Sequence, residues 1–197
     1  MNKRIILNTI GVVFIAWGLI AIIKSISEGI PDKVFWMSWQ GLIIIGIACL
    51  RRNGFLMSTQ LNILAIPTIL WSIDLAYALA TGQFIFGLSA NFFSYSSVVK
   101  KIILMEHLII FPFTIYSLYT IKLERTDMWK ISVLQLVLIF FLTIFLTSPE
   151  TNVNCAFESC LTFTLPNYQI IWFVFMLSSI AITNILIANI IPRKEPV

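Results

Sequence analysis

The stretch IILNTIGVVFIAWGLIAII, residues 5–23, is a predominantly apolar run that decides the fold class. A helix needs roughly 20 such residues to cross the hydrocarbon core of a bilayer. Lys3 and Arg4 precede the run, as basic residues do in a secretory signal. However, the run is longer than a usual signal core, and Lys24-Ser-Ile-Ser-Glu28 follows it in place of a small-x-small cleavage site. We therefore interpret residues 5–24 as a retained first membrane span.

The composition of the whole chain agrees with this interpretation. Of the 197 residues, 59% are hydrophobic and only 11% are charged, whereas about a quarter of the residues in a soluble domain are charged. So few charges cannot cover a globule in water, so lipid must be the solvent for most of the surface. The net charge of +4 then reflects the basic loops that membrane proteins keep in the cytoplasm. We expect no nucleic-acid partner.

Five further stretches have the length and character of membrane spans. They are residues 34–50, 56–80, 102–121, 129–148 and 168–191. We therefore predict an all-α membrane protein, a single transmembrane domain over residues 1–197 with a bundle of about six transmembrane helices. Pro67 and Pro112 fall inside spans, where neighbouring helices tolerate the kinks that proline causes. The halves of the chain show no internal repeat of the kind that many transporters have.

The basic residues predict the orientation of the bundle. With the N-terminus inside, nine of the 13 Lys and Arg residues fall on the cytoplasmic side and four on the outer side. The cytoplasmic set is Lys3, Arg4, Arg51, Arg52, Lys122, Arg125, Lys130, Arg193 and Lys194, and the outer set is Lys24, Lys33, Lys100 and Lys101. Since cytoplasmic loops carry the excess of positive charge, we predict that both termini lie in the cytoplasm.

The predicted outer loops are long, whereas the inner turns are short and charged. Residues 81–101 and 149–167 form these outer loops, and long loops tend to be functional or disordered. Segment 83–95 is too apolar for a loop that is free in water. We expect it to lie in the membrane interface or to fold back into the bundle.

Asp74 is the most informative polar residue, because it falls inside the third predicted span. A carboxylate near the membrane centre costs about 2.5–3.5 kcal/mol on insertion scales, and such groups face the bundle interior and have a partner. His107, the single histidine, is predicted at a similar depth, within about one helical turn. As a catalytic pair, Asp74 would fix the tautomer of His107 and raise its basicity. The alternative is a structural pair that locks two helices together.

Four neighbouring residues are candidates for a binding role. Trp71 and Tyr77 lie three residues to either side of Asp74, on the same helix face, and either line a pocket or pack within the bundle. Asn152 and Asn154 either build a turn or reach into the cavity of His107. We interpret Glu106, by contrast, as an interfacial charge paired with Lys100 or Lys101.

The cysteines predict a disulfide and no metal site. Cys155 and Cys160 share an outer loop, and in an oxidising compartment such a pair can form a disulfide. With one histidine and no second cysteine pair nearby, the chain has no standard zinc spacing. A Gly-rich phosphate loop is also missing, so we expect no cofactor.

The order of these motifs resembles that of a family of uncharacterised bacterial multi-span membrane proteins. The motifs are Trp71-x-x-Asp74, Gly82, His107-Leu-x-x-x-Pro112 and Asn152-Val-Asn154, and they cover most of the chain after residue 60. The chain departs from the family after the fourth span. Members often carry a basic stretch with a Gly-Tyr-Asp-like motif there, whereas this chain reads Ile121-Lys-Leu-Glu-Arg-Thr-Asp127. The resemblance implies that the outer Asp, His and Asn positions recur together. It brings no activity.

Three functions fit these features. The first is a membrane protein with a polar Asp/His site in the outer half of the bundle, which binds or hydrolyses a lipid-like molecule. The second is a non-enzymatic accessory or scaffold subunit, with another membrane protein or a second copy as its partner. The third, ranked last because deep charges and a repeat are missing, is a small transporter. We expect multi-pass insertion in a bacterial inner membrane.

Overall fold

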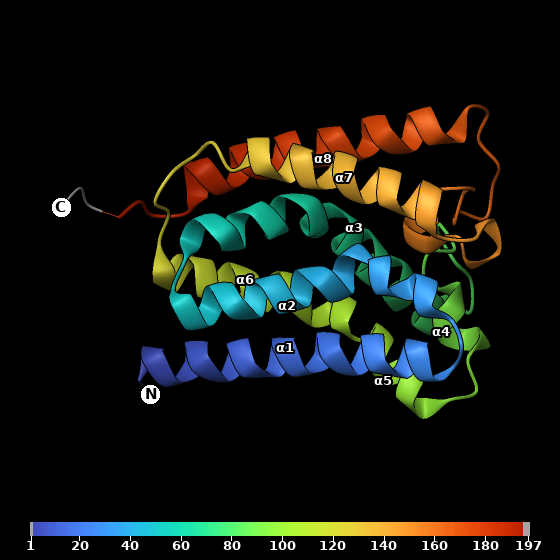
Figure 1. The fold of residues 1–197 in the computed structure, drawn as a ribbon, viewed down its shortest axis with the longest axis horizontal. Helices are drawn as coiled ribbons and strands as arrows, with labels where there is room; N and C mark the ends of the chain where they lie inside the picture. Colours follow the sequence, from blue (N-terminus) through green and yellow to red (C-terminus); the bar gives the residue numbers. More distant parts are fainter. Residues whose placement is uncertain (1, 195–197) are drawn as a thin grey trace.

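A computed structural model describes residues 2–194 as a bundle of helices that run side by side, most of them antiparallel to their chain neighbours (Figure 1). The long helices are α1 (Lys3–Ser27), α2 (Met37–Arg51), α3 (Gly54–Thr81), α6 (Glu106–Ile121), α7 (Trp129–Leu146) and α8 (Tyr168–Ile190). The short ones are η1 (Pro31–Phe35), α4 (Ala90–Ser94), α5 (Val98–Leu104), η2 (Pro149–Thr151) and η3 (Val153–Cys155). Within the described residues, the β pairing is limited to one isolated bridge between Leu123 and Arg193. The predicted all-α membrane bundle is confirmed.

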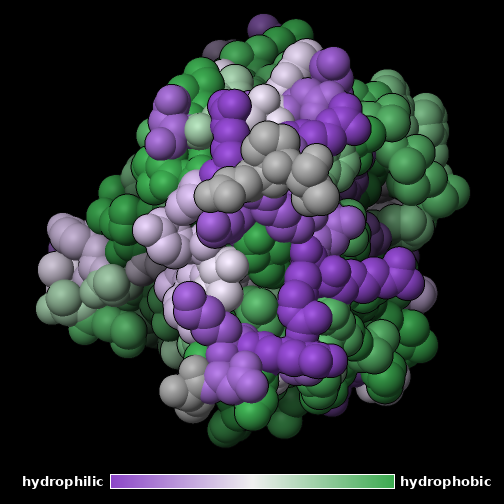
Figure 2. Space-filling model, turned by 90° about the vertical axis from the view of Figure 1, so that its left-hand side faces the viewer, coloured by the Kyte–Doolittle hydropathy of each residue, from purple (hydrophilic) through white to green (hydrophobic). Residues whose placement is uncertain are grey.

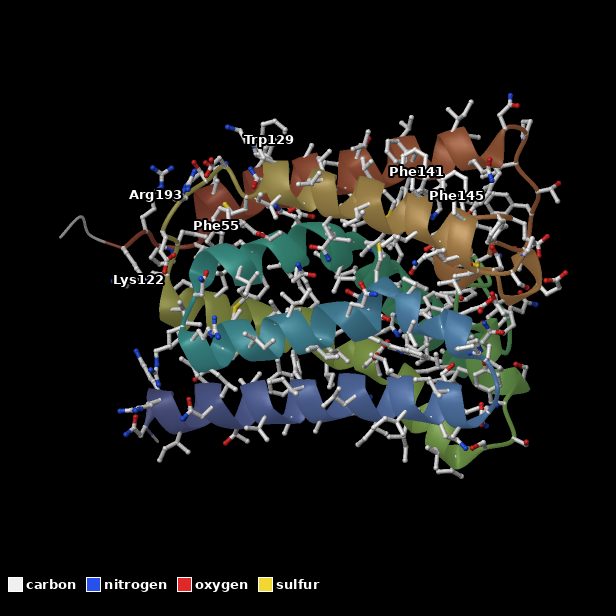
Figure 3. The ribbon with its side chains drawn as sticks, in the orientation of Figure 1. Phe55, Lys122, Trp129, Phe141, Phe145 and Arg193 are labelled. Atoms are coloured by element: carbon white, nitrogen blue, oxygen red, sulfur yellow. A yellow bond between two sulfur atoms is a disulfide. The ribbon has the colours of Figure 1, made fainter. Side chains whose placement is uncertain are left out.

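Four of the helices are long and apolar enough to cross a membrane: α1, α3, α7 and α8. Their outward side chains are hydrophobic, as contact with lipid requires. On α7, for example, Phe141 and Phe145 stack on each other on the outer face, and the Phe145 side chain is 76% exposed (Figure 3). In water such a surface would be an aggregation hazard, whereas in a bilayer it is the solvated surface.

Helices α2 and α6 are shorter than a usual span. With 15 and 16 residues, they extend about 22–24 Å at 1.5 Å per residue, against roughly 30 Å for the hydrocarbon core. Each continues into a second short helix at one end: η1 precedes α2, and α5 precedes α6 with a break at Met105. Helix α2 lies between α1 and α3, whereas α6 lies behind them and packs mainly against α3 (Figure 1). The count of six spans stays a prediction.

The two ends of the bundle differ in charge. One end, here called the basic end, holds the described termini near Lys3 and Lys194 and the turns 52–53 and 122–128 (Figure 1). Polar side chains cover much of this end (Figure 2), and Figure 3 shows Lys122 and Arg193 there beside Phe55. The opposite end, here called the loop end, carries the connections 28–36, 82–105 and 147–167. The nine basic residues predicted to be cytoplasmic all belong to elements that meet at the basic end.

Backbone contacts hold the basic end together. The amide of Leu123 donates to the carbonyl of Pro192, and the amide of Lys194 donates to the carbonyl of Leu123, each at 2.8 Å. Lys194 also forms an ion pair with Glu124. These contacts attach the residues that follow α8 to the connection between α6 and α7.

Glycines let α1 and α2 approach each other closely. A β-carbon added at Gly46 would lie 2.6 Å from the carbonyl oxygen of Gly11, and one at Gly18 would lie 2.8 Å from that of Trp39. Small residues that bring backbones together are a main source of helix association in lipid, where the hydrophobic effect between helices is absent. The α1–α2 pair is therefore specified by residues without side chains.

We predict that Gly46→Leu lowers the thermal unfolding temperature of the detergent-solubilised protein. The added side chain meets backbone atoms of α1 that cannot move aside, and overpacking of this kind costs about 1–3 kcal/mol or more. The control is Val12→Leu on the lipid-facing side of α1, where Val12 is 58% exposed. Equal unfolding temperatures for the two variants would contradict the close α1–α2 contact.

Candidate functional site

The carboxylate of Asp74 lies fully buried near the loop end of α3 and is saturated with hydrogen bonds. Its Oδ1 accepts from the backbone amides of Ile85, Phe86 and Gly87 at 2.9, 2.7 and 3.2 Å. Its Oδ2 accepts from the amide and the hydroxyl of Ser89 at 2.9 and 2.7 Å. Consecutive amides that converge on one anion form a backbone nest. Here the anion is part of the protein itself.

The predicted pairing of Asp74 with His107 is therefore wrong. Gly82 ends α3 with φ +74°, a conformation that glycine adopts without steric cost, and the chain turns back over the end of the helix. The amides of Ile85, Phe86, Gly87 and Ser89 thereby reach Asp74 and occupy both of its oxygens. The two residues do lie on helices that pack against each other, but a loop supplies the partners of Asp74.

Trp71 and Leu104 are the groups that hold His107. Its ring stacks on the buried Trp71 indole, with centroids 4.7 Å apart, and its Nδ1 lies 3.0 Å from the carbonyl oxygen of Leu104. Because a carbonyl only accepts hydrogen bonds, this contact places the proton of a neutral imidazole on Nδ1 and leaves Nε2 as an acceptor. Trp71 thus supports His107, whereas Tyr77 is 40% exposed and does not join them.

A groove between α3 and α6 opens beside His107. Its volume is about 330 Å³. The lining residues are Ile69, Ser72, Ile73, Ala76, His107, Leu108, Phe111 and Pro112. Only Ser72 and His107 bring polar side chains to it, and the Ser72 hydroxyl lies within hydrogen-bonding distance of the Thr68 and His107 carbonyl oxygens. The groove is therefore an apolar trough with one polar residue from each helix.

Glu106 is the functional candidate that sequence reasoning missed. We interpreted it as an interfacial charge, but its side chain is fully buried, and the Ser38 hydroxyl donates to its Oε1 at 2.6 Å. The imidazole Nδ1 of His107 lies 3.8 Å from the same oxygen. Oε2 has no hydrogen-bond partner within residues 2–194. An unsatisfied neutral group in such a place costs about 1–3 kcal/mol, and an unpaired buried ion costs several kcal/mol more.

The lysines expected near Glu106 bind elsewhere. Lys100 forms an ion pair with Glu28 at 2.9 Å, and Lys101 lies over the Phe92 ring. Together with Lys24, Lys100 holds the pKa of Glu28 below its ordinary value. A helical pattern would have signalled the burial of Glu106, since Glu106, Ile110, Thr114 and Ser117 share the inward face of α6.

Asn152 and Asn154 organise the loop between α7 and α8 and do not reach the groove. The Asn154 side chain accepts from the Met37 amide at 2.9 Å and donates to the Phe35 carbonyl at 2.8 Å, so it anchors the start of α2. Asn152 accepts from the amides of Phe157 and Glu158 within its own loop. Asn152 therefore builds a turn, as one of the two alternatives predicted. Asn154 instead links its loop to the start of α2.

Cys155 and Cys160 form a disulfide in this loop. The Tyr168 hydroxyl donates to the Cys155 carbonyl, and the indole of Trp172 donates to the Asn154 carbonyl. Both contacts attach the loop to α8. Residues 2–194 contain no group of three or more His, Cys, Asp or Glu side chains placed to hold a metal ion.

Comparison with protein-family models, with curated proteins and with solved structures finds no match to this chain. The resemblance to a bacterial family therefore stays a prediction.

We predict that Asp74→Asn releases the segment 85–89. The amide of asparagine has one acceptor oxygen in place of two, so several donors in the nest lose their partner, at about 1–3 kcal/mol for each buried group left unsatisfied. Hydrogen exchange at these amides should accelerate at least tenfold. Asp127→Asn, at the opposite end of the bundle, is the matched control and should leave their exchange unchanged. Equal protection in the wild type and Asp74→Asn would contradict the anchoring role.

Proposed function

We propose that this protein is a multi-pass membrane protein that binds a lipid-like molecule in the groove between α3 and α6. The observation that carries the proposal is the groove itself, apolar along most of its length and polar at Ser72 and His107. Its volume lies at the small end of the range for ligand sites, about 300–1,000 Å³. An acyl chain fits an apolar trough of this kind, and a head group with a hydrogen-bond donor, such as a hydroxyl or an amide N–H, suits the imidazole of His107.

His107 supplies the specificity in this proposal. Its Nδ1 is engaged by the Leu104 carbonyl, so Nε2 is the ring nitrogen left to accept a hydrogen bond from the ligand. Stacking on Trp71 fixes the plane of the ring. A rigid imidazole at the edge of an apolar groove favours a ligand with a hydrogen-bond donor, such as a hydroxyl, next to its hydrocarbon chain.

The contacts favour binding over hydrolysis. Asp74 spends both oxygens on the loop amides and does not orient His107. Ser72 makes its hydrogen bonds to backbone carbonyls and does not contact the imidazole. General-base activation of a nucleophile requires hydrogen-bond contact between the two groups, and among the described residues the groove lacks such a pair.

The membrane location and topology of the protein are part of the same proposal. We infer that six helices cross a bacterial inner membrane with both termini in the cytoplasm, because the basic residues belong to the end that holds the first and last described residues. The groove then opens toward the outer leaflet, since His107 belongs to the turn of α6 nearest the loop end.

A large side chain that fills the groove should prevent lipid from binding there. We expect Ala76→Trp to reduce cross-linking to a phosphatidylethanolamine that carries a diazirine in one acyl chain, with cross-links mapped by mass spectrometry to peptides of α3 and α6. The matched control is Ile185→Trp, at a lipid-facing position of α8 that is 59% exposed. It should retain the wild-type pattern. Wild-type and Ala76→Trp proteins that cross-link equally at α3 and α6 would contradict the proposal.

A scaffold role is the second candidate. The hydrogen bonds that join the loops at the loop end favour it. The loops 82–97 and 147–167 are joined by a hydrogen bond from the Thr162 amide to the Phe86 carbonyl at 2.8 Å. Asp32 accepts from the Ser148 amide at 2.7 Å, which ties the second loop to η1. A preformed outer surface of this kind suits docking of a membrane-protein partner or a second copy. Light scattering in detergent would reveal the second copy as a doubled protein mass.

A further inference from the structure

Three buried oxygen atoms on the inward face of α6 have no hydrogen-bond partner among residues 2–194. They are Oε2 of Glu106, the Thr114 hydroxyl and the Ser117 hydroxyl. These residues extend along about 16 Å of the helix, at 1.5 Å per residue. Nearly all buried polar atoms in proteins have a partner, so each exception requires an explanation. Glu106 requires it most, because it is the one that ionises.

Glu106 is the first residue of α6, so the partial positive charge of that helix N-terminus acts on it, but residues 2–194 place no full positive charge beside it. From α2 the Ser38 hydroxyl and the Trp39 indole face it, and from its own helix His107 is an ionisable neighbour, at 3.8 Å. On the α1 side, the Trp17 indole donates to the Ile103 carbonyl, and Lys24 and Lys100 are paired with Glu28. Within residues 2–194, no Lys or Arg nitrogen lies within 4.0 Å of the carboxyl group.

Only one of the two charge states of Glu106 suits these surroundings. As an anion, it would be buried with the Ser38 hydroxyl and the Trp39 indole as its side-chain donors and without a cation, and buried charges without a counter-ion take up a proton instead. As a neutral acid, it leaves only one weakly polar oxygen unsatisfied. The contact with Ser38 persists in either state, because a hydroxyl both donates and accepts.

We propose that Glu106 is a proton-binding site, whose carboxyl group carries its hydrogen ion at neutral pH inside the outer half of the bundle. This goes beyond lipid binding and does not depend on it. The two sites are nevertheless adjacent, because His107 lines the groove and approaches Glu106 with its Nδ1. Asp74 differs in kind, since five hydrogen bonds stabilise its ionised form.

Infrared spectroscopy of the purified protein in phosphatidylcholine vesicles tests the proposal. At neutral pH the wild type should show the carbonyl stretch of a protonated carboxylic acid, and Glu106→Gln should lose that band. Glu150→Gln is the control: Glu150 is exposed in the loop end, and the Ser148 hydroxyl holds its pKa below the ordinary value. Its removal should leave the band intact. A wild-type spectrum without the band overturns the proposal.

Ser38→Ala provides a second measurement that does not require Glu106→Gln to fold. Removal of the Ser38 hydroxyl takes away the hydrogen bond to Oε1, so the acid band should move to higher frequency without losing intensity. Asp74→Asn should leave its position unchanged. A band that does not move in Ser38→Ala belongs to another carboxyl group and overturns the assignment to Glu106.

Discussion

Five hydrogen bonds to the carboxylate of Asp74 form the interaction on which the loop end of this protein depends. In a bilayer, water is not at hand to satisfy a charge, so the protein must supply every partner itself. Asp74 obtains its partners from the backbone of segment 85–89, which lies over the end of α3. The same contact gives those amides an acceptor, so the needs of the loop and of the charge are met together.

The position of the first loop then determines that of the second. With Asp74 holding residues 85–89, the Phe86 carbonyl lies where it accepts from the Thr162 amide. A β-carbon on Gly87 would come within 2.5 Å of the Thr162 side chain, so the two loops fit only because residue 87 has none. The Trp172 indole and the Asn154 side chain tie the second loop to α8 and to α2. The loop end is consequently a closed and ordered surface.

Since Asp74 is occupied, three polar groups on α3 and α6 have separate roles. Asp74 is structural, His107 faces the groove between the two helices, and Glu106 lies inside the bundle with an unpartnered oxygen. Residues 106 and 107 are neighbours in sequence, yet they point to different surroundings because successive residues of a helix lie about 100° apart. The groove between α3 and α6 and the interior position of Glu106 thus involve the same turn of α6.

The sequence was sufficient for the fold class and for the general location of the polar residues. Long apolar runs predict membrane helices because length and hydropathy are local properties, and Asp74 was correctly singled out as a buried group that needs a partner. Its actual partners could not be predicted, since every residue except proline has a backbone amide and the residue types do not show which amides meet a buried carboxylate. Glu106 was misinterpreted because nearby lysines were assumed to be free, whereas Lys100 binds Glu28 from another helix.

The central claim is that Asp74 belongs to the loop and not to His107. A double-mutant cycle on the free energy of unfolding tests it most directly, with Asp74→Asn combined with Ser89→Ala in one cycle and with His107→Gln in the other. We predict a coupling energy of about 1 kcal/mol or more between Asp74 and Ser89, as expected for groups in direct contact, and additivity within about 0.5 kcal/mol for Asp74 and His107. Strong coupling to His107 and none to Ser89 would contradict the account.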